Sequence, residues 1–168
     1  MQYEAVGFRR PFFIGILLCV FAAPSAAEDV QASPRAAADL SSFVLPDLNG
    51  NDVSLGQFHD REAIVVCFLG TECPLAQFYG PRLQAMSDEF SDRGVAFVGV
   101  NANSQDSLEE VAAYAQKHDI KFPMLKDVQA KLAQYLGATR TPEVFLLGAD
   151  GKVQYSGRVD KQFTFGSG

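Results

Sequence analysis

The sequence has few basic side chains and few histidines. Its 168 residues include 14 Lys and Arg against 20 Asp and Glu, a formal net charge of −6, and only two histidines. A protein that binds the phosphate backbone of a nucleic acid needs a concentrated basic surface, so this composition predicts no nucleic-acid partner. His59 and His118 lie in polar stretches far apart in the chain, without other ligands at a metal-site spacing. We therefore predict no metal and no other cofactor.

Tryptophan is absent and cysteine is scarce, with three residues. One of them, Cys19, falls in the apolar run 12–21, which is followed by small residues up to Ala27. This pattern is typical of a secretory signal peptide cleaved after Ala27, and the run is too short for a comfortable membrane span. Arg9 and Arg10 leave general and twin-arginine export open. The mature protein is expected to be periplasmic or extracellular, with no stable membrane span.

Composition changes along the chain divide it into three parts. Residues 1–27 are the expected signal peptide, and residues 28–40 are rich in Ala, Ser and Pro, which predicts a flexible linker. Residues 41–168 are expected to form one domain, because a chain with 48% hydrophobic residues can bury one core. Removal of the signal leaves two cysteines, Cys67 and Cys73.

The domain alternates patterns that are typical of strands and helices. Apolar runs without alternation predict strands buried on both faces, and apolar residues at helical spacing predict helices. The expected elements, in order, are a hairpin around Asn49-Gly50, a central strand at 63–69, a helix at 74–91 containing Pro81 and ending near Gly94, a strand at 95–100, a helix at 108–118 with a capping box of Ser107 and Glu110, an extended piece at 122–125, a helix at 128–136 closed by Gly137, and strands at 144–147 and 153–156. This order predicts a βαβ unit followed by an antiparallel pair.

Cys73 lies where the central strand gives way to a helix. The first turn of a helix has unpaired N–H groups and the positive end of the dipole, which stabilise a thiolate. Cys73 is therefore the candidate nucleophile, although the neighbouring Glu72 acts in the opposite direction. Cys67 lies inside the strand and is expected to point into the core. Because a disulfide needs convergent Cβ vectors, we expect no bond between Cys67 and Cys73.

The chain from Phe43 to Gly157 resembles the thioredoxin-like superfamily, in particular its secreted redoxins of the AhpC/TSA-like or TlpA-like kind. The resemblance rests on the motif Gly70-Thr71-Glu72-Cys73-Pro74-Leu75-Ala76, on Pro81 and on Thr141-Pro142. It implies a thioredoxin-like α/β fold, with a central mixed sheet flanked by helices and an N-terminal β-hairpin. In the family such a Thr-Pro is a cis peptide facing the active cysteine, which implies substrate docking at Thr141 and Pro142. A trans proline that opens a strand is the alternative.

The chain departs from the family pattern at its reactive positions. Ala76 stands where thioredoxins carry the second cysteine, so no local dithiol can form. Thr71 is one residue later than the threonine of the peroxiredoxin pattern, and Arg140 is only a nearby candidate for the cation that pairs with the thiolate. Cys67 stands where thioredoxins keep a buried acid. The resemblance also implies a closing helix after Gly157, which we expect to be missing here, either because it is absent or because the chain is truncated.

Two functions fit these residues. The first is an exported thiol-dependent oxidoreductase, a disulfide reductase or peroxiredoxin-like antioxidant enzyme, in which Cys73 attacks a protein disulfide or a small peroxide and an external thiol reductant resolves the product. The second is a binding module without turnover that uses the groove at Thr141-Pro142. Asn101 and Asn103 follow a strand end, where they either line the cleft or cap the loop.

Overall fold

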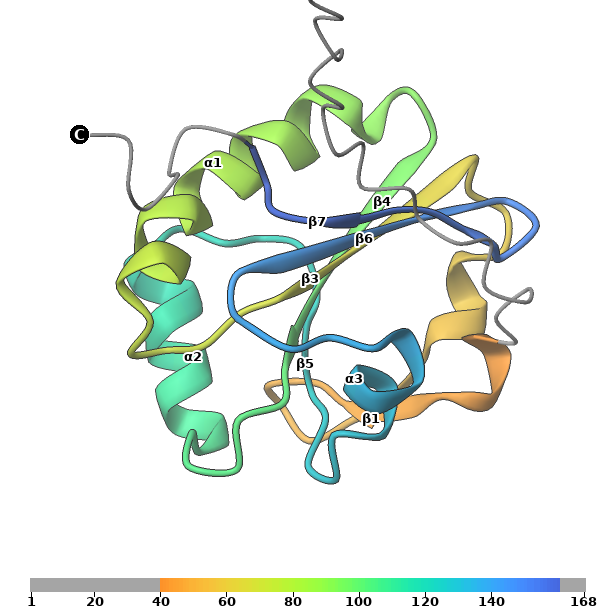
Figure 1. Cartoon of the computed structure of the whole chain (residues 1–168). Helices are drawn as coiled ribbons and strands as arrows, with labels where there is room; N and C mark the ends of the chain where they lie inside the picture. The colour runs from red at the N-terminus through yellow and green to blue at the C-terminus, as the bar shows by residue number, and fades with distance from the viewer. Residues whose placement is uncertain (1–39, 161–168) are drawn as a thin grey trace, which may run out of the picture. The chain divides into compact units, whose positions relative to one another are not determined.

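The central apolar run forms β3 (Ala63–Phe68), the middle strand of a five-stranded sheet in the computed structural model, which describes residues 40–160 (Figure 1). β3 pairs in parallel with β4 and antiparallel with β6. The strand order is β5-β4-β3-β6-β7, with β4 at Val95–Asn101, β5 at Met124–Lys126, β6 at Glu143–Gly148 and β7 at Val153–Gly157. The sheet is mixed, and the prediction of a central buried strand is confirmed.

Helices cover both faces of this sheet. Figure 1 shows α1 and α2 on one side and α3 on the other, where the small N-terminal sheet also packs. The bounds are α1 Pro74–Ser91, α2 Leu108–Lys117, α3 Lys131–Leu136, β1 Val44–Pro46 and β2 Asp52–Ser54, with 3-10 turns η1 at Leu40–Ser42 and η2 at Leu55–Phe58. The element order is the one that the sequence predicts.

The hydrophobic core has two parts, one on each face of the sheet. Along β3, Val66 and Phe68 belong to the part beneath α3, whereas Cys67 belongs to the part beneath α1 and α2, as does Leu69 directly after the strand. All four side chains are buried, and each large apolar one contributes roughly 1.5–3 kcal/mol to folding. This double burial explains why the strand has no polar alternation.

The local signals for the hairpin and for α2 are confirmed. β1 and β2 pair antiparallel across the turn that contains Gly50, whose φ of +82° is available to glycine at little cost. At the start of α2, Ser107 accepts from the backbone N–H of Glu110, and the Glu110 carboxylate accepts from the N–H of Ser107. This capping box satisfies N–H groups that the helix leaves free.

α3 begins later than the expected residue 128. The Asp127 carboxylate accepts from the backbone N–H of Lys131 at 2.9 Å and from that of Ala133 at 3.0 Å, so it caps a helix that starts at Lys131. Ala130, which precedes the helix, has a left-handed backbone with φ +51°. Gly137 ends α3 in a left-handed conformation, as predicted.

α1 carries Pro81 inside it, and the helix continues to Ser91. Its C-cap is Asp92 in a right-handed conformation, whereas Gly94, the expected cap, lies two residues further on with φ +74°. The glycine therefore turns the chain toward β4 after the helix has already ended.

Some predictions fall outside residues 40–160. They are the signal peptide at 1–27, all of the linker at 28–40 except its last residue, and the chain end after residue 160, where the closing helix of the family is expected to be missing. Leu40, the last residue of the expected linker, is buried in the core. Within the described range, no helix combines the length and the apolar character that a membrane span needs.

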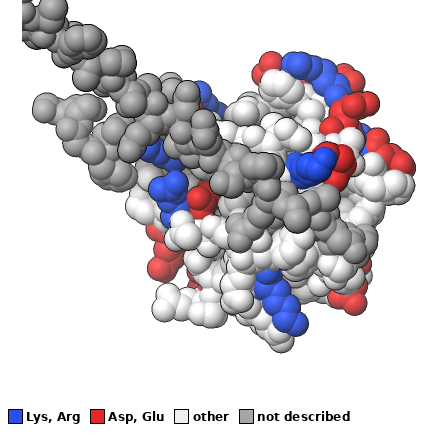
Figure 2. All heavy atoms as spheres, turned by 45° about the vertical axis from the view of Figure 1, so that its right-hand side comes forward, with Lys and Arg blue, Asp and Glu red and all other residues white. Residues whose placement is uncertain are grey.

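Charged side chains of both signs are interspersed on the face shown in Figure 2, where acidic and basic groups lie next to one another. Exposed ion pairs join Lys121 to Asp119 at 3.2 Å and Lys152 to Asp150 at 2.7 Å. Such pairs contribute little to stability, because water solvates them and salt screens them.

Gly99 in β4 is the position where we expect an added methyl group to be most damaging. A Cβ at Gly99 would lie 2.1 Å from Met124 Sδ and 3.1 Å from Phe122 Cε2. Gly99→Ala should therefore lower the free energy of unfolding by roughly 1–3 kcal/mol through overpacking, as measured by urea denaturation. A loss well below about 1 kcal/mol would contradict this packing.

Candidate functional site

Cys73 lies at the junction between β3 and α1. It is the N-cap of α1 with an extended backbone, φ −72° and ψ 116°, and Pro74 is the first residue of the helix. The thiol is partly exposed, and its Sγ donates a hydrogen bond to the carbonyl oxygen of Thr141 at 3.1 Å. The peptide bond between Thr141 and Pro142 is cis. The structure thus brings together four of the residues that the sequence nominated.

The pairing of β3 with β6 explains why these segments meet. Phe68 is the register partner of Glu143, so the residues before Glu143 reach the loop that follows β3. Gly70 permits the close approach, because a Cβ on it would lie 2.8 Å from Asn103 Nδ2 and 3.1 Å from Thr141 Oγ1. Any larger residue at this position would push the two neighbours away.

Thr71 is held through both polar groups of its backbone. Its N–H donates to Asp106 Oδ2 at 3.0 Å, and its carbonyl oxygen accepts from Gln77 Nε2 at 2.9 Å. The Gln77 amide oxygen in turn accepts from Lys117 Nζ at 3.4 Å. The chain is therefore anchored two residues before Cys73 by side chains from other segments.

Arg140 does not face the thiol. Its Nε lies 3.7 Å from Glu143 Oε1, and its backbone N–H and that of Thr139 both donate to Glu143 Oε2. Glu143 is buried, whereas the Arg140 side chain is more than half exposed. Within residues 40–160 the guanidinium is thus oriented toward a carboxylate that shapes its own loop, and not toward Cys73.

A buried polar cluster beneath the loop was missed by the sequence reasoning. Asn101 is fully buried, its Nδ2 donates to the carbonyl oxygen of Leu69 at 3.0 Å and to Asp106 Oδ2, and its Oδ1 accepts from Lys126 Nζ at 2.6 Å. Lys126 also donates to the carbonyl oxygen of Asn103. We call Lys126, Asn101 and Asp106 the buried amide bridge, because the Asn101 amide joins a cation to an anion.

The two asparagines therefore differ in role. Asn101 lies inside the fold, and Asn103 lies at the surface, where its Nδ2 donates to Asp106 at 3.2 Å. Asn103 also lines a pocket of about 280 Å³ together with Thr141 and Arg140. Asn101 therefore holds the loop after β3, and Asn103 lines the pocket. The only sequence signal for either role was the position of the two residues at the end of a strand.

Burial and hydrogen bonding oppose each other in the buried amide bridge. Burial raises the pKa of Asp106, but hydrogen bonds from Thr71, Asn101 and Asn103 outweigh it and hold the pKa below its ordinary value. Burial lowers the pKa of Lys126, against the attraction of neighbouring carboxylates that include Asp106. The hydrogen bonds thus favour a charged Asp106, whereas burial works against the charge on Lys126.

Cys67 is a thiol of a different kind. It is fully buried, and burial raises its pKa to about 12. Tyr114 lies nearby, and its hydroxyl donates to the carbonyl oxygen of Ala76 at 2.6 Å. The pKa of Tyr114 is raised by burial and, to a smaller extent, by Cys73 and Cys67. Both cysteines are free thiols, and Ala76, in the place of a second active-site cysteine, is also fully buried.

The two histidines lie in different environments. His59 is exposed and forms an ion pair with Asp60, whereas His118 is partly buried, packs on the Tyr114 ring and has no hydrogen-bond partner for Nε2 among the described residues. Burial and Lys117 lower the pKa of His118. Nowhere in residues 40–160 do three or more metal-ligating side chains come together.

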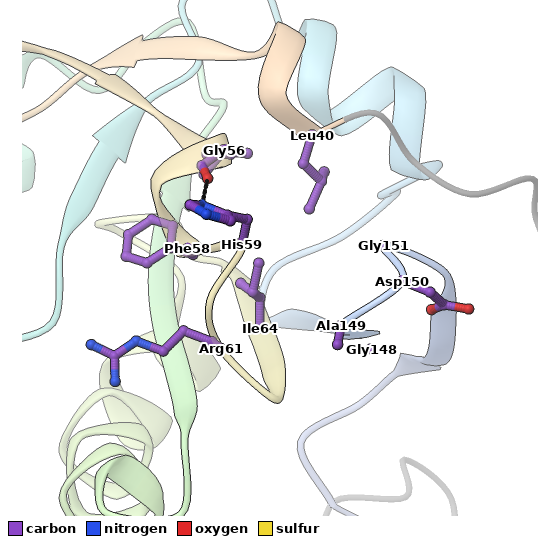
Figure 3. A pocket seen from close by; sticks show the side chains of 11 residues that line it. Leu40, Gly56, Phe58, His59, Arg61, Ile64, Gly148, Ala149, Asp150 and Gly151 are labelled. Atoms are coloured by element: carbon purple, nitrogen blue, oxygen red, sulfur yellow. Dashed lines mark hydrogen bonds between the residues drawn. The ribbon is translucent and has the colours of Figure 1, made fainter.

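A larger pocket of about 430 Å³ lies at the other end of β3 (Figure 3). Ile64, near the start of that strand, contributes to its apolar lining, and the ring of His59 is turned to the Gly56 carbonyl oxygen at 2.9 Å. In Figure 3 the side chains of Arg61 and Asp150 extend away from the centre of the pocket. Its polar groups therefore do not converge, and the thiol lies at the opposite end of the strand.

Comparison with known proteins agrees with this geometry. The AhpC/TSA family model matches residues 36–156. Thiol-disulfide oxidoreductase ResA from Bacillus thuringiensis subsp. konkukian is 27% identical over 112 residues, which are 67% of this chain and 63% of ResA. The chain thus spans less than two thirds of the length of that relative.

Solved structures agree as well. A hypothetical protein from Sinorhizobium meliloti 1021 is 30% identical with a TM-score of 0.69, over 75% of this chain and 72% of that one. A secreted Mycobacterium tuberculosis disulfide oxidoreductase, described as homologous to E. coli DsbE, is 19% identical with a TM-score of 0.63, over 76% and 92% of the two chains. At this identity the second match concerns the fold alone, and that fold is thioredoxin-like.

The contrast between the two thiols gives a direct test. In native protein at pH 8, brief treatment with iodoacetamide should label Cys73 at least roughly 100-fold faster than Cys67, because Cys67 is buried and stays protonated. Peptide mapping by mass spectrometry measures both sites, and labelling in urea serves as the control in which both thiols react. Preferential native labelling of Cys67 would show that the assignment of β3 is wrong.

The charge on Asp106 predicts a pH-dependent stability. A carboxyl whose folded pKa lies below its ordinary value of 3.8 stabilises the fold above that value, and the contribution is lost as the pH falls through the folded pKa. Urea unfolding of wild type and Asp106→Asn should therefore differ most near pH 7, and the difference should shrink below about pH 4. A difference that grows on acidification would contradict the hydrogen-bonding pattern of Asp106.

Proposed function

The chain belongs to the AhpC/TSA family of thioredoxin-like redoxins, and we propose that it is an exported thiol-dependent oxidoreductase with Cys73 as its nucleophile. The observation that carries the proposal is the contact of Cys73 Sγ with the carbonyl oxygen of Thr141 at 3.1 Å, at the start of a helix. This contact supports the proposal, because the thiol lies beside the backbone segment where we propose that an extended substrate binds. Export rests on the signal-like pattern of residues 1–27.

The reaction we propose is thiol–disulfide exchange. The Cys73 thiolate attacks one sulfur of a protein disulfide, a new S–S bond forms to Cys73, and the other substrate sulfur leaves as a thiolate. An external thiolate then attacks the substrate sulfur of the mixed disulfide, which releases Cys73 as a thiolate and joins the external thiol to the substrate. A second external thiolate attacks the external sulfur of that disulfide, so the substrate ends with two thiols and the external reductant ends as a disulfide. The external thiol is required because Ala76 offers no second sulfur and Cys67 is buried with a pKa of about 12.

A small peroxide is a second substrate of the same thiolate. Attack on the O–O bond would give a Cys73 sulfenic acid and an alcohol or water, and two external thiols would return the sulfur to the thiol with release of water. Arg140, the candidate cation for the peroxide, pairs with Glu143 and is not turned toward Cys73 among the described residues 40–160. This arrangement favours the disulfide as substrate.

The alternative function is a binding module that has lost turnover. The buried methyl group of Ala76 and the orientation of Arg140 favour it, because both remove groups that help catalysis in relatives of this fold. Such a module would use Thr141 and Pro142 to bind an extended peptide without a redox step.

A paired assay distinguishes these functions. Ala76→Cys should raise insulin reduction with dithiothreitol by roughly tenfold over the native protein, because a local thiol resolves the mixed disulfide faster than an external one. Ala113→Cys on the exposed side of α2 is the matched control, and it should leave the rate unchanged. Native protein treated with peroxide should carry a sulfenic acid on Cys73, which mass spectrometry detects after trapping.

Two results would contradict the proposal. If native protein already reduces insulin as fast as Ala76→Cys, resolution does not depend on an external thiol. If Cys73 stays unmodified by peroxide and by disulfides, and Ala76→Cys is inert too, the binding module is the better description.

A further inference from the structure

The buried amide bridge, formed by Lys126, Asn101 and Asp106, contacts the backbone on both sides of Gly70. We propose that its two charged members, Lys126 and Asp106, are positioning residues for Cys73, which orient the thiol by fixing the loop that carries it. The proposal rests on the proposed function wherever the experiment measures disulfide exchange by Cys73.

The first argument is geometric. Asn101 Nδ2 donates to the carbonyl oxygen of Leu69 at 3.0 Å, and Asp106 Oδ2 accepts from the N–H of Thr71 at 3.0 Å. The Leu69 carbonyl and the Thr71 N–H lie on either side of Gly70, so the buried amide bridge holds this turn of the chain at two points. The turn runs directly into Cys73, whose own N–H donates to the carbonyl oxygen of the residue between the two anchors at 3.3 Å. A shift of the anchors would therefore move the thiol.

The second argument concerns charge in a buried place. Lys126 is 6% exposed, Asp106 7% and Asn101 0%, so the bridge has little contact with water. The amide of Asn101 turns its oxygen to the ammonium group and its NH₂ to the carboxylate, which joins the two charges in one chain of hydrogen bonds. Removing one charge leaves the other buried without its partner, which is costly. Glu110 and Asp127 also act on Lys126, yet neither has a hydrogen bond to the loop in the described structure.

The third argument concerns what Cys73 must do. Attack on a disulfide requires the sulfur to approach along the S–S bond while the substrate backbone lies beside Thr141, so the reaction depends on orientation. Alkylation by a small reagent such as iodoacetamide demands much less orientation. The ratio of the two rate constants is therefore a measure of thiol placement, separate from thiol reactivity.

The experiment compares this ratio in wild type, Asp106→Asn, Lys126→Met and the double variant. The disulfide probe is the oxidised dimer of acetyl-glycyl-cysteinyl-glycinamide, and mass spectrometry follows the mixed disulfide on Cys73. Each single variant should lower the ratio by about tenfold or more, because a displacement near 1 Å is enough for such a loss. The double variant should lose less than the product of the single losses, since neither Lys126 nor Asp106 is then left charged at the bridge without the other.

Two controls separate placement from general destabilisation. Asp52→Asn removes an exposed carboxylate on β2 and should keep the ratio within about twofold of wild type. Cys67 reports on the core of every variant, because its buried thiol is labelled only when the core opens. A ratio that is unchanged in variants with a protected Cys67 would overturn the proposal. Loss of Cys67 protection in all three bridge variants would also overturn it, since the bridge would then act on stability alone.

A wild-type protein that does not react with the disulfide probe would refute the proposed function, and the anchoring of the loop by the buried amide bridge could still be tested. If wild type forms no mixed disulfide with the probe, amide hydrogen exchange at Thr71 and Cys73 becomes the deciding measurement. Both N–H groups are hydrogen-bonded in the structure, at 3.0 and 3.3 Å. Exchange about tenfold faster in Asp106→Asn than in Asp52→Asn would support the anchoring of the loop, and equal exchange would refute it.

Discussion

The pairing of β3 with β4 on one side and with β6 on the other determines which residues surround Cys73. Phe68, at the end of β3, is the register partner of Val100 and of Glu143. The loop after β3 therefore lies between the end of β4, which supplies Asn101, and the start of β6, which follows the Thr141 contact. A slip of one residue in either pairing would turn the side chains to the opposite face and separate these groups.

The site has an apolar environment around Cys67 and a polar, hydrogen-bonded environment around Asp106. On the face covered by α1 and α2, Cys67 occupies an apolar interior that keeps its thiol protonated. Beneath the loop, in contrast, hydrogen bonds keep Asp106 charged inside the protein. The buried acid of this site therefore comes from the loop between β4 and α2 and not from β3, where the related thioredoxins carry theirs. The carboxylate reaches the chain at Thr71, ahead of the thiol.

The sequence was sufficient for the features that depend on local patterns, and insufficient for those that depend on distant contacts. The apolar run of β3, the Ser107 capping box and the turn at Gly50 each follow from neighbouring residues, and so does the place of Cys73 at a helix start. In the buried amide bridge, Asn101 bonds to Lys126, 25 positions away, and to Asp106, 5 positions away. Hydrogen bonds of this kind leave no periodic pattern in the sequence. A lysine at a strand end is ordinarily exposed, so nothing in the sequence indicated that Lys126 is buried. The start of α3 was misplaced because the strong cap, Asp127, lies before an irregular turn.

Gly70 limits how this site could change into another kind of redoxin. A peroxiredoxin-like pattern would require a threonine at residue 70, three positions before the cysteine. The added Cβ would lie 2.8 Å from Asn103 Nδ2, and Asn103 is itself bonded to Asp106. The substitution would thus displace a partner of the carboxylate that anchors Thr71, and would disturb the loop before any new hydroxyl could act. A threonine at residue 70 would therefore gain its hydroxyl only by turning the exposed Asn103 amide aside, and Asp106 would lose one of the hydrogen bonds that it accepts.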